Sequence, residues 1–249
     1  MYTNLLVLGR VAYADGLALQ ARLIAARKAG HIADTLVLLE HAPVLTLGRN
    51  ARRENIVVSD EFLRAKGIEV HEINRGGDVT YHGPGQLVGY PIVDLRGDLP
   101  GKRGPHLGPV DFVRLLEELL IRACGEFRVP AQRIPKCTGV WTIPNGSIRE
   151  KKLAAIGVHV SAGVTSHGFA LNVSTDLRDF AWIIPCGITD RGVTALDLES
   201  PLEPAPSFAD AVNATSRAFG RVFNRQMLRA DSIEDLLNSQ AGRQAEPSS

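Results

Sequence analysis

The spacing of apolar residues changes repeatedly along this chain, and the order of these changes limits the folds that it can adopt. Apolar residues at helical intervals predict a helix over 111–124, and a weaker set predicts another over 14–28. Runs rich in leucine and β-branched residues predict a strand over 4–8 and two strand pieces within 35–49, broken at Pro43. Strands and helices interleave without a regular βαβ rhythm, so we expect an α+β fold with a mixed β-sheet.

The remaining predicted helices and strands complete a single domain. Ser59 is expected to cap a short helix, and Ser207, with Asp210 three residues later, is expected to cap a long one. Further strands are predicted over 68–73, 87–95, 139–143, 152–160 and 167–173, and further helices over 59–67, 208–226 and 233–237, with a loop over 96–109. We therefore expect one catalytic domain over 1–226 and a C-terminal extension over 227–249, whose last residues are expected to be disordered.

Composition excludes several classes of protein. The chain has 249 residues, 45% of them hydrophobic, and 28 Lys and Arg against 27 Asp and Glu, a net charge of +1. This excludes a disordered chain and a nucleic-acid binder that relies on bulk positive charge. No apolar stretch approaches the roughly 20 residues that span a bilayer, and no signal sequence is recognisable. Three cysteines, Cys124, Cys137 and Cys186, are too few for a disulfide scaffold, so we expect a cytoplasmic protein without membrane association.

A glycine-rich segment over 75–87 combines four glycines with arginine, threonine, tyrosine, histidine and glutamine. Glycines allow the backbone to approach a ligand closely, which favours a binding loop. A tight turn with an incidental histidine explains the same residues equally well. The segment matches neither the dinucleotide-binding nor the P-loop pattern, so phosphate binding has little support.

Lys152 begins the predicted strand 152–160. Simple alternation places it on one face with Ala154, Ile156, Val158 and Val160 and places His159 on the other. A lysine at the edge of an apolar face is partly desolvated, which makes it a usable base. The pattern alone favours an ordinary lysine whose ammonium reaches water.

Two cysteines compete for a catalytic role. Cys186 lies between Pro185 and Gly187, and a glycine N–H beside a nucleophile is suited to stabilising an oxyanion. Cys137 lies in an equally short predicted loop, next to Lys136. Spacing alone does not choose between them, whereas Cys124, on the predicted helix 111–124, is expected to be a core residue.

Four segments, taken together and in this order, resemble the lipoyl(octanoyl) transferase family of lipoate biosynthesis. Residues 75–86 match its pattern R-G-G-x-x-T-[YW]-H-G-P-G-Q at every defined position. Lys152 precedes an [LI]-A-[AS]-I-G segment, residues 167–172 match H-G-[FL]-A-L-N, and residues 185–187 match P-C-G. The resemblance covers roughly residues 4–225. It implies a fold related to biotin and lipoate protein ligases, with helices flanking a mixed sheet and a smaller second sheet beside it.

The resemblance also implies the roles of individual residues. Cys186 would be the nucleophile and Lys152 its proton-transfer partner, and His82 would orient this pair. The expected substrate-binding residues surround the acyl chain and carbonyl, and they are Arg75, Gly76, Gly77, Asp78, Val79, Thr80, Tyr81, His82, Ala155, Ile156, Gly157, Gly168, Phe169 and Ala170. No cofactor and no metal is implied.

The implied reaction moves an octanoyl group from octanoyl-acyl carrier protein, through a Cys186 thioester, to a lysine of a lipoyl domain. The implied acceptors are the lipoyl domains of 2-oxoacid dehydrogenases and the glycine cleavage H protein, and a monomer is expected. Both carrier domains are usually acidic, and Arg49, Arg52 and Arg53 form a basic cluster that could meet one of them. A solvated loop without such a role explains this cluster slightly better.

Four other functions remain to be distinguished. An ATP-dependent lipoate or biotin ligase shares the implied fold but needs no cysteine, and a lipoyl amidotransferase uses a cysteine for closely related chemistry. A cysteine hydrolase would pair Cys186 with a histidine such as His167. A non-catalytic acyl-binding module would need neither Cys186 nor Lys152.

Overall fold

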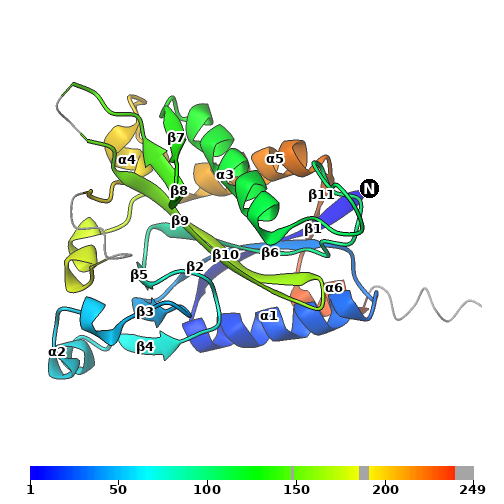
Figure 1. Cartoon of the computed structure of the whole chain (residues 1–249), viewed down its shortest axis with the longest axis horizontal. Helices are drawn as coiled ribbons and strands as arrows, with labels where there is room; N and C mark the ends of the chain where they lie inside the picture. The colour runs from blue at the N-terminus through cyan, green and yellow to red at the C-terminus, as the bar shows by residue number, and fades with distance from the viewer. Residues whose placement is uncertain (147–148, 185–190, 239–249) are drawn as a thin grey trace, which may run out of the picture.

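A computed structural model describes residues 1–146, 149–184 and 191–238 of the chain. Its centre is an eight-stranded sheet in the order β11-β1-β2-β6-β10-β9-β8-β7 (Figure 1). β1 pairs in parallel with β11 and β2, and the remaining neighbours are antiparallel, so the sheet is mixed as expected. In chain order these strands are β1 (Tyr2–Val11), β2 (Thr35–His41), β6 (Gln86–Ile92), β7 (Ala131–Ile134), β8 (Cys137–Thr142), β9 (Lys152–Ser161), β10 (Val164–Asn172) and β11 (Gln226–Ala230).

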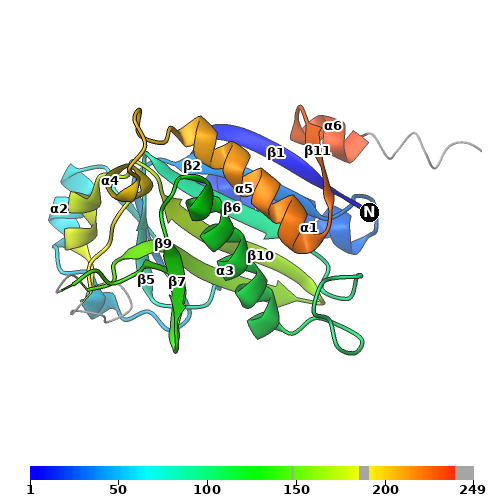
Figure 2. The same ribbon diagram turned by 90° about the horizontal axis from the view of Figure 1, so that it is seen from above.

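Helices cover both faces of this sheet (Figures 1 and 2). α3 (Pro109–Glu126) and α5 (Phe208–Phe223) pack together on one face, where Phe112 and Phe219 are almost fully buried. α1 (Tyr13–Lys28) and α6 (Ile233–Asn238) lie on the other face, over a second core. Each helix buries one apolar stripe, which is why its spacing is visible in the sequence.

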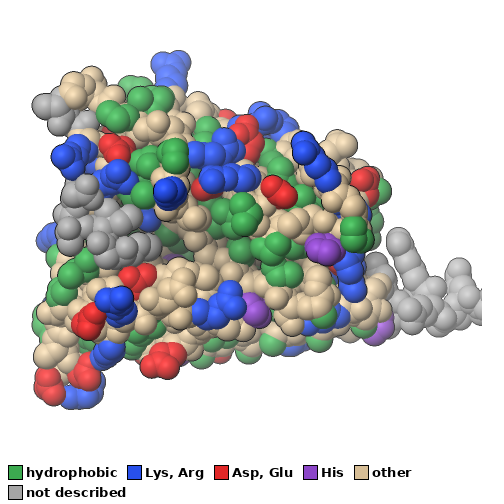
Figure 3. Space-filling view, in the orientation of Figure 1, with side chains coloured by type: hydrophobic (Ala, Val, Ile, Leu, Met, Phe, Trp, Pro, Cys, Tyr) green, Lys and Arg blue, Asp and Glu red, His purple; other side chains and the backbone are tan. Residues whose placement is uncertain are grey.

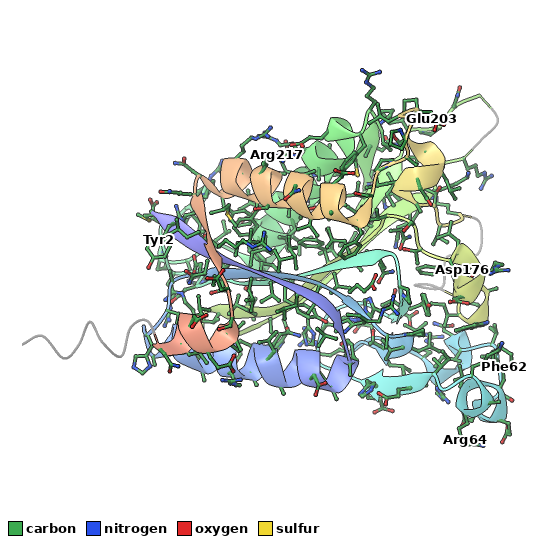
Figure 4. All side chains as sticks on the ribbon, turned by 180° about the vertical axis from the view of Figure 1, so that it is seen from behind. Tyr2, Phe62, Arg64, Asp176, Glu203 and Arg217 are labelled. Carbon is green, nitrogen blue, oxygen red and sulfur yellow. The ribbon has the colours of Figure 1, made fainter. Side chains whose placement is uncertain are left out.

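A smaller sheet in the order β4-β3-β5 stands beside α1 on that second face (Figure 1). Its strands are β3 (Val44–Leu47), β4 (Glu69–Glu72) and β5 (Val79–His82). A third core joins them to α2 (Asp60–Ala65) and the 3-10 turn Leu177–Trp182. Phe62 of α2 contacts Trp182 with ring centroids 5.7 Å apart, and Figure 4 shows Phe62 and Asp176 at this end of the molecule. Two short elements complete the fold, the 3-10 turn Arg53–Asn55 and α4 (Leu196–Glu199).

Most expected elements are confirmed, including the predicted helices over 14–28, 59–67, 111–124 and 233–237. Two expectations were wrong. The glycine-rich segment contains a strand, β5, which had been expected to be loop. The helix expected to continue to residue 226 ends at Phe223, because Asn224 adopts the left-handed conformation (φ 51°) that commonly ends helices.

The first residues of the expected C-terminal extension belong to the main sheet. β11 pairs with β1 from Gln226 to Ala230, and α6 follows it. No helix in the described part of the chain is both long and apolar enough to cross a membrane.

Candidate active site

A cavity of about 520 Å³ lies between the main sheet and the smaller sheet. Asn50, Lys136 and Thr138 line it as exposed rim residues, whereas Val88 and Tyr90 of β6 line it as buried ones. This volume is in the usual range for a small-molecule site. The described residues contain no group of three His, Cys, Asp or Glu side chains that could hold a metal ion.

Close backbone packing holds the segment before β5 against the main sheet. The Gly76 N–H donates to the Val158 carbonyl at 3.0 Å. A Cβ on Gly157 would lie 2.7 Å from the Gly76 carbonyl oxygen and 3.1 Å from Arg75 Cδ, so only glycine fits there. Arg75 is 8% exposed, and its Nη2 donates to the backbone carbonyl and the hydroxyl of Thr46, both at 2.8 Å. A guanidinium is thereby fixed in the wall of the cavity.

A chain of buried hydrogen bonds determines the tautomer of His82. The amide Nε2 of Gln86 donates to the Tyr81 carbonyl at 3.2 Å, so the opposite atom, Oε1, must face His82 Nδ1 at 2.7 Å. That oxygen can only accept, so His82 carries its proton on Nδ1 and leaves Nε2 as an acceptor. Gln86 Nε2 also donates to Asn172 Oδ1 at 3.0 Å, and Asn172 Nδ2 donates to the Thr194 carbonyl at 2.9 Å. We call His82, Gln86, Asn172 and Thr194 the amide chain.

Both histidines that line the cavity are neutral at pH 7. Burial, with smaller contributions from His41 and Arg75, lowers the pKa of His82 to about 3. Burial and the Arg75 charge lower the pKa of His167 to about 4. His167 Nε2 lies 2.7 Å from Asn74 Oδ1, and its backbone has a left-handed φ of 56°. A non-glycine residue held in this conformation is characteristic of functional sites.

Lys152 enters the cavity because of a β-bulge. Val140 pairs with Ala154 and the next residue, Trp141, pairs with Lys152, so Leu153 is an extra residue in β9. Leu153 and Ala154 both lie in the core under α3. Because these two successive residues both face the core, the side chain of Lys152 faces the opposite side, which is the cavity. The expectation that Lys152 shares a face with Ala154 was wrong, because simple alternation does not allow for a bulge.

The environment of Lys152 is enclosed. The residue is 8% exposed, and its Nζ lies 4.6 Å from the centre of the Trp141 ring, a cation–π distance. Its backbone N–H donates to the Gly192 carbonyl at 2.9 Å, and its carbonyl accepts from the Thr194 N–H at 3.0 Å. Thr194 also ends the amide chain, so His82 and Lys152 are connected through one short segment.

Cys186 lies outside the described residues, within 185–190. The described residues on the two sides of that gap make different contacts. The Ile184 N–H donates to the Asn55 carbonyl at 2.8 Å, and Val193 pairs with Lys152 and lines the cavity.

The other two cysteines differ sharply. Cys124 is fully buried on α3, and burial raises the pKa of its thiol to about 12, which confirms a core residue. Cys137 was expected in a loop, but it begins β8, because residues 137–142 pair with β7. It lines the cavity, and Arg191 Nη1 donates to its sulfur at 3.2 Å.

Most of the expected site residues line the cavity. They are Lys152, Arg75, Gly77, Asp78, Val79, Thr80, His82, Ala155, Ile156, Gly157, Gly168, Phe169 and Ala170. Gly76 does not line the cavity; besides the contact with Val158, its carbonyl accepts from Arg75 Nη1 at 3.0 Å. Tyr81 points into the third core, where its hydroxyl donates to Asp179 at 2.6 Å. Sequence reasoning missed Tyr13 and Tyr90, and it included Gln86 only as part of the glycine-rich segment. Asn172 also lines the cavity, and it is a polar interruption of the apolar predicted strand 167–173, which is the sequence signal for it.

Comparison with known proteins identifies the family of this chain. Residues 12–220 match the family described as "Lipoyl protein ligase A/B catalytic domain". The chain belongs to this family. The resemblance expected from the sequence is thereby confirmed.

Curated relatives cover nearly the whole chain. A protein of Acidobacterium capsulatum named octanoyltransferase is 60% identical over 95% of this chain and 96% of its own length. Octanoyltransferases of Koribacter versatilis and Caldicellulosiruptor bescii are 49% and 46% identical, over 94% and 95% of this chain and 89% and 99% of their own lengths.

Solved structures confirm the fold. A bi-partite lipoate protein ligase of Thermoplasma acidophilum has a TM-score of 0.67 at 17% identity, covering 96% of this chain and 91% of its own. A lipoate-protein ligase A with bound ATP has a TM-score of 0.66 at 17% identity, covering 96% and 94%. The lipoate ligase fold, with a large mixed sheet and a smaller three-stranded one, is the fold expected for this family.

Proposed function

We propose that this chain transfers an octanoyl group from octanoyl-acyl carrier protein to a lysine of a lipoyl domain, through a thioester on Cys186. The observation that carries the proposal is the position of Lys152. A bulge turns this lysine into the cavity, and its backbone pairs with the segment that follows Cys186. The octanoyltransferase names of relatives at 46–60% identity support the same reaction.

In the first half-reaction, Lys152 as a neutral amine takes the proton of the Cys186 thiol. The thiolate attacks the thioester carbonyl of the donor, and the carbon–sulfur bond to the carrier's phosphopantetheine breaks. The leaving sulfur takes the proton back from Lys152. One thioester replaces another of similar free energy, so no ATP is needed.

In the second half-reaction, the lysine amine of the acceptor attacks the Cys186 thioester. A new amide bond forms, the Cys186 sulfur leaves, and Lys152 carries the proton from the amine to that sulfur. Backbone N–H groups near Gly157 and Gly187 are the proposed donors to the oxyanion in both halves.

His82 supports this chemistry without transferring a proton between the reacting groups. Its pKa of about 3 makes it a weak base, and the amide chain fixes its proton on Nδ1. Its Nε2 is therefore an acceptor only, suited to holding an N–H or O–H in the cavity. Through Thr194 it also helps to orient Lys152, which agrees with the orienting role expected from the sequence.

The proposed acceptors are the lipoyl domains of 2-oxoacid dehydrogenases and the glycine cleavage H protein. The T. acidophilum ligase is described together with its E2 lipoyl domain, which supports acceptors of this kind. We propose that the chain acts as a cytoplasmic monomer. On the face shown in Figure 3, basic side chains lie among acidic ones. Arg52 pairs with Glu54, and Arg53 pairs with Asp60. Carrier domains would thus meet a mixed surface around the cavity.

The main alternative is an ATP-dependent ligase, since solved neighbours of this fold include one with bound ATP. Such an enzyme would activate free octanoate or lipoate and would not depend on Cys186. Product formation from octanoyl-acyl carrier protein without ATP favours the transferase. Product formation only from free acid and ATP would overturn the proposed transferase activity.

Mass spectrometry of the intact protein tests the intermediate. After mixing with octanoyl-acyl carrier protein, we expect one octanoyl adduct, which is lost in Cys186→Ser and kept in Cys137→Ser. The Cys137 variant is the matched control, because this thiol also lines the cavity. An adduct that survives Cys186→Ser and disappears in Cys137→Ser would assign the nucleophile to Cys137, and no adduct in the parent protein would reject the mechanism.

A further inference from the structure

Two buried tyrosines from different elements line the cavity. Tyr13 is the first residue of α1, and Tyr90 lies on β6. Both line the cavity, and each is only 4% exposed. Neither residue belongs to the glycine-rich segment. We call this pair the tyrosine wall.

Tyr90 is held from behind by a buried histidine. His41 Nδ1 lies 2.8 Å from the Val11 carbonyl, which can only accept, so His41 carries its proton on Nδ1. The hydroxyl of Tyr90 therefore donates to His41 Nε2, at 2.6 Å. His41 is fully buried and does not line the cavity. The polar end of Tyr90 is thus satisfied outside the cavity, and the ring cannot swing aside without losing this bond.

Tyr13 is held by aromatic contacts on two sides. Its ring meets the edge of His41 at 5.0 Å between centroids and stacks on His82 at 6.1 Å with an interplanar angle of 11°. Gly16, one helical turn later, makes the approach of His41 possible, because a Cβ there would lie 2.8 Å from His41 Cε1. The helix is therefore seated directly against the end of the cavity.

Solid core lies beyond the tyrosine wall. Tyr90 belongs to the apolar cluster under α1, together with Leu6, Leu23 and Val37, each fully buried. On the cavity side, Val88 and Ala170 pair across β6 and β10 and face the same space. Val88 lies between Gln86 and Tyr90 along β6, so this pair forms an apolar floor between the level of Gln86 and the tyrosine wall.

The strand register gives the distance between the wall and the reacting end. Asn172 pairs with Gln86, near the level of Lys152, and Tyr90 lies four residues further along β6. Four residues of antiparallel strand span about 13 Å. This is the scale of a medium-length acyl chain extended along the sheet from a carbonyl near Lys152.

We propose that Tyr13 and Tyr90 stop the methyl end of the acyl chain and so set the chain length that this enzyme transfers. The inference rests on the proposed octanoyl transfer and names a specificity determinant for it. A longer chain would have to displace a ring held by His41, and a shorter chain would leave the floor in front of the wall uncovered. Each missing methylene then weakens transfer about fourfold, the usual effect of losing one buried CH₂ group.

Competition among acyl-carrier proteins loaded with hexanoyl, octanoyl, decanoyl or dodecanoyl groups tests the proposal. In Tyr90→Ala we expect decanoyl and dodecanoyl transfer to rise at least tenfold relative to octanoyl transfer. Ile92→Ala is the matched control, because Ile92 is buried on the same face of β6 and does not line the cavity. It should keep the octanoyl preference of the parent protein. An unchanged profile in folded Tyr90→Ala would overturn the proposal.

A second variant keeps the test decisive if Tyr90→Ala does not fold. Ala170→Leu adds bulk to the floor in front of the wall, and it should shift preference from octanoyl towards hexanoyl by roughly tenfold. Thermal melting of each variant checks folding. Absence of transfer from every donor by the parent protein would reject the proposed function, whereas transfer with no shift in either folded variant would reject only the tyrosine wall.

Discussion

Gln86 Oε1 lies 2.7 Å from His82 Nδ1, and this contact fixes the position of a proton in the active site. Because the Gln86 amide Nε2 donates both to Asn172 Oδ1 at 3.0 Å and to the Tyr81 carbonyl at 3.2 Å, its oxygen must face the ring. The histidine of the glycine-rich segment therefore presents a bare nitrogen to the cavity.

Breaking the amide chain should allow the His82 ring to exchange between its two neutral tautomers. In Asn172→Leu, Gln86 Nε2 loses its partner at 3.0 Å and the Thr194 carbonyl loses its donor. We expect a loss of ~1–3 kcal/mol in the free energy of unfolding and a lower kcat. ¹⁵N NMR of the His82 ring should change from a single Nδ1-protonated form to a mixture. Asn4→Leu is the control, since the Asn4 amide donates to Thr35 between β1 and β2, away from the amide chain. An unchanged His82 spectrum in Asn172→Leu would refute the role of the amide chain.

Acid should destabilise the fold through the two cavity histidines. The pKa of His82 is about 3 and that of His167 about 4, both below the unfolded value near 6.5. Below pH 6.5 the unfolded state therefore binds more protons than the folded state. Stability is full above that pH and falls as pH drops towards 4, by up to about 1.4 kcal/mol per pH unit for each histidine. Urea unfolding across this range measures the slope, which His82→Gln should reduce. If stability fell as steeply with pH in His82→Gln as in the parent protein, the lowered pKa of His82 would be contradicted.

Removing the Lys152 amine should make acylation depend on pH. Without this base, the Cys186 thiol must ionise unaided, near its ordinary pKa of about 8.5. We expect Lys152→Ala to acylate roughly 10²- to 10⁴-fold more slowly at pH 7 and to recover as pH rises towards 9. Lys151→Ala is the matched control, because Lys151 instead pairs with Glu199 at 3.5 Å. Full activity of Lys152→Ala at pH 7 would remove this residue from the mechanism.

Gly157→Ala should separate the glycine-rich segment from the sheet. The added methyl would lie 2.7 Å from the Gly76 carbonyl, so the segment must shift and carry Arg75 with it. We expect a loss of about 1–3 kcal/mol in stability and weaker acylation. Gly125→Ala, in helix α3 with nothing within 4 Å of the new methyl, should instead stabilise by roughly 0.5–1 kcal/mol. Chemical denaturation measures the free energy of unfolding of the Gly157→Ala and Gly125→Ala variants. Equal values would refute the close packing at Gly157.

The sequence predicted the parts of the fold whose cause is local. The helix over 111–124 was visible because Phe112, Leu116 and Leu119 repeat along one buried stripe. The motif residues of the site were recognised through a family pattern. Lys152 was assigned to the wrong face, because nothing in the residues 152–160 reveals the bulge at Leu153, which depends on the pairing with β8. Tyr13 and Tyr90 were missed for a similar reason. Each resembles an ordinary buried aromatic residue, and only the packing of α1 on β6 brings them together.

The pairing of β11 with β1 joins the two ends of the chain in one ladder. During synthesis, β1 emerges first, and β2 can pair with one of its edges early. Its other edge stays open until Gln226–Ala230 has left the ribosome, long after β2. A truncation before Gln226 would leave that edge free to pair with another molecule, so aggregation of nascent or clipped chains should begin at β1.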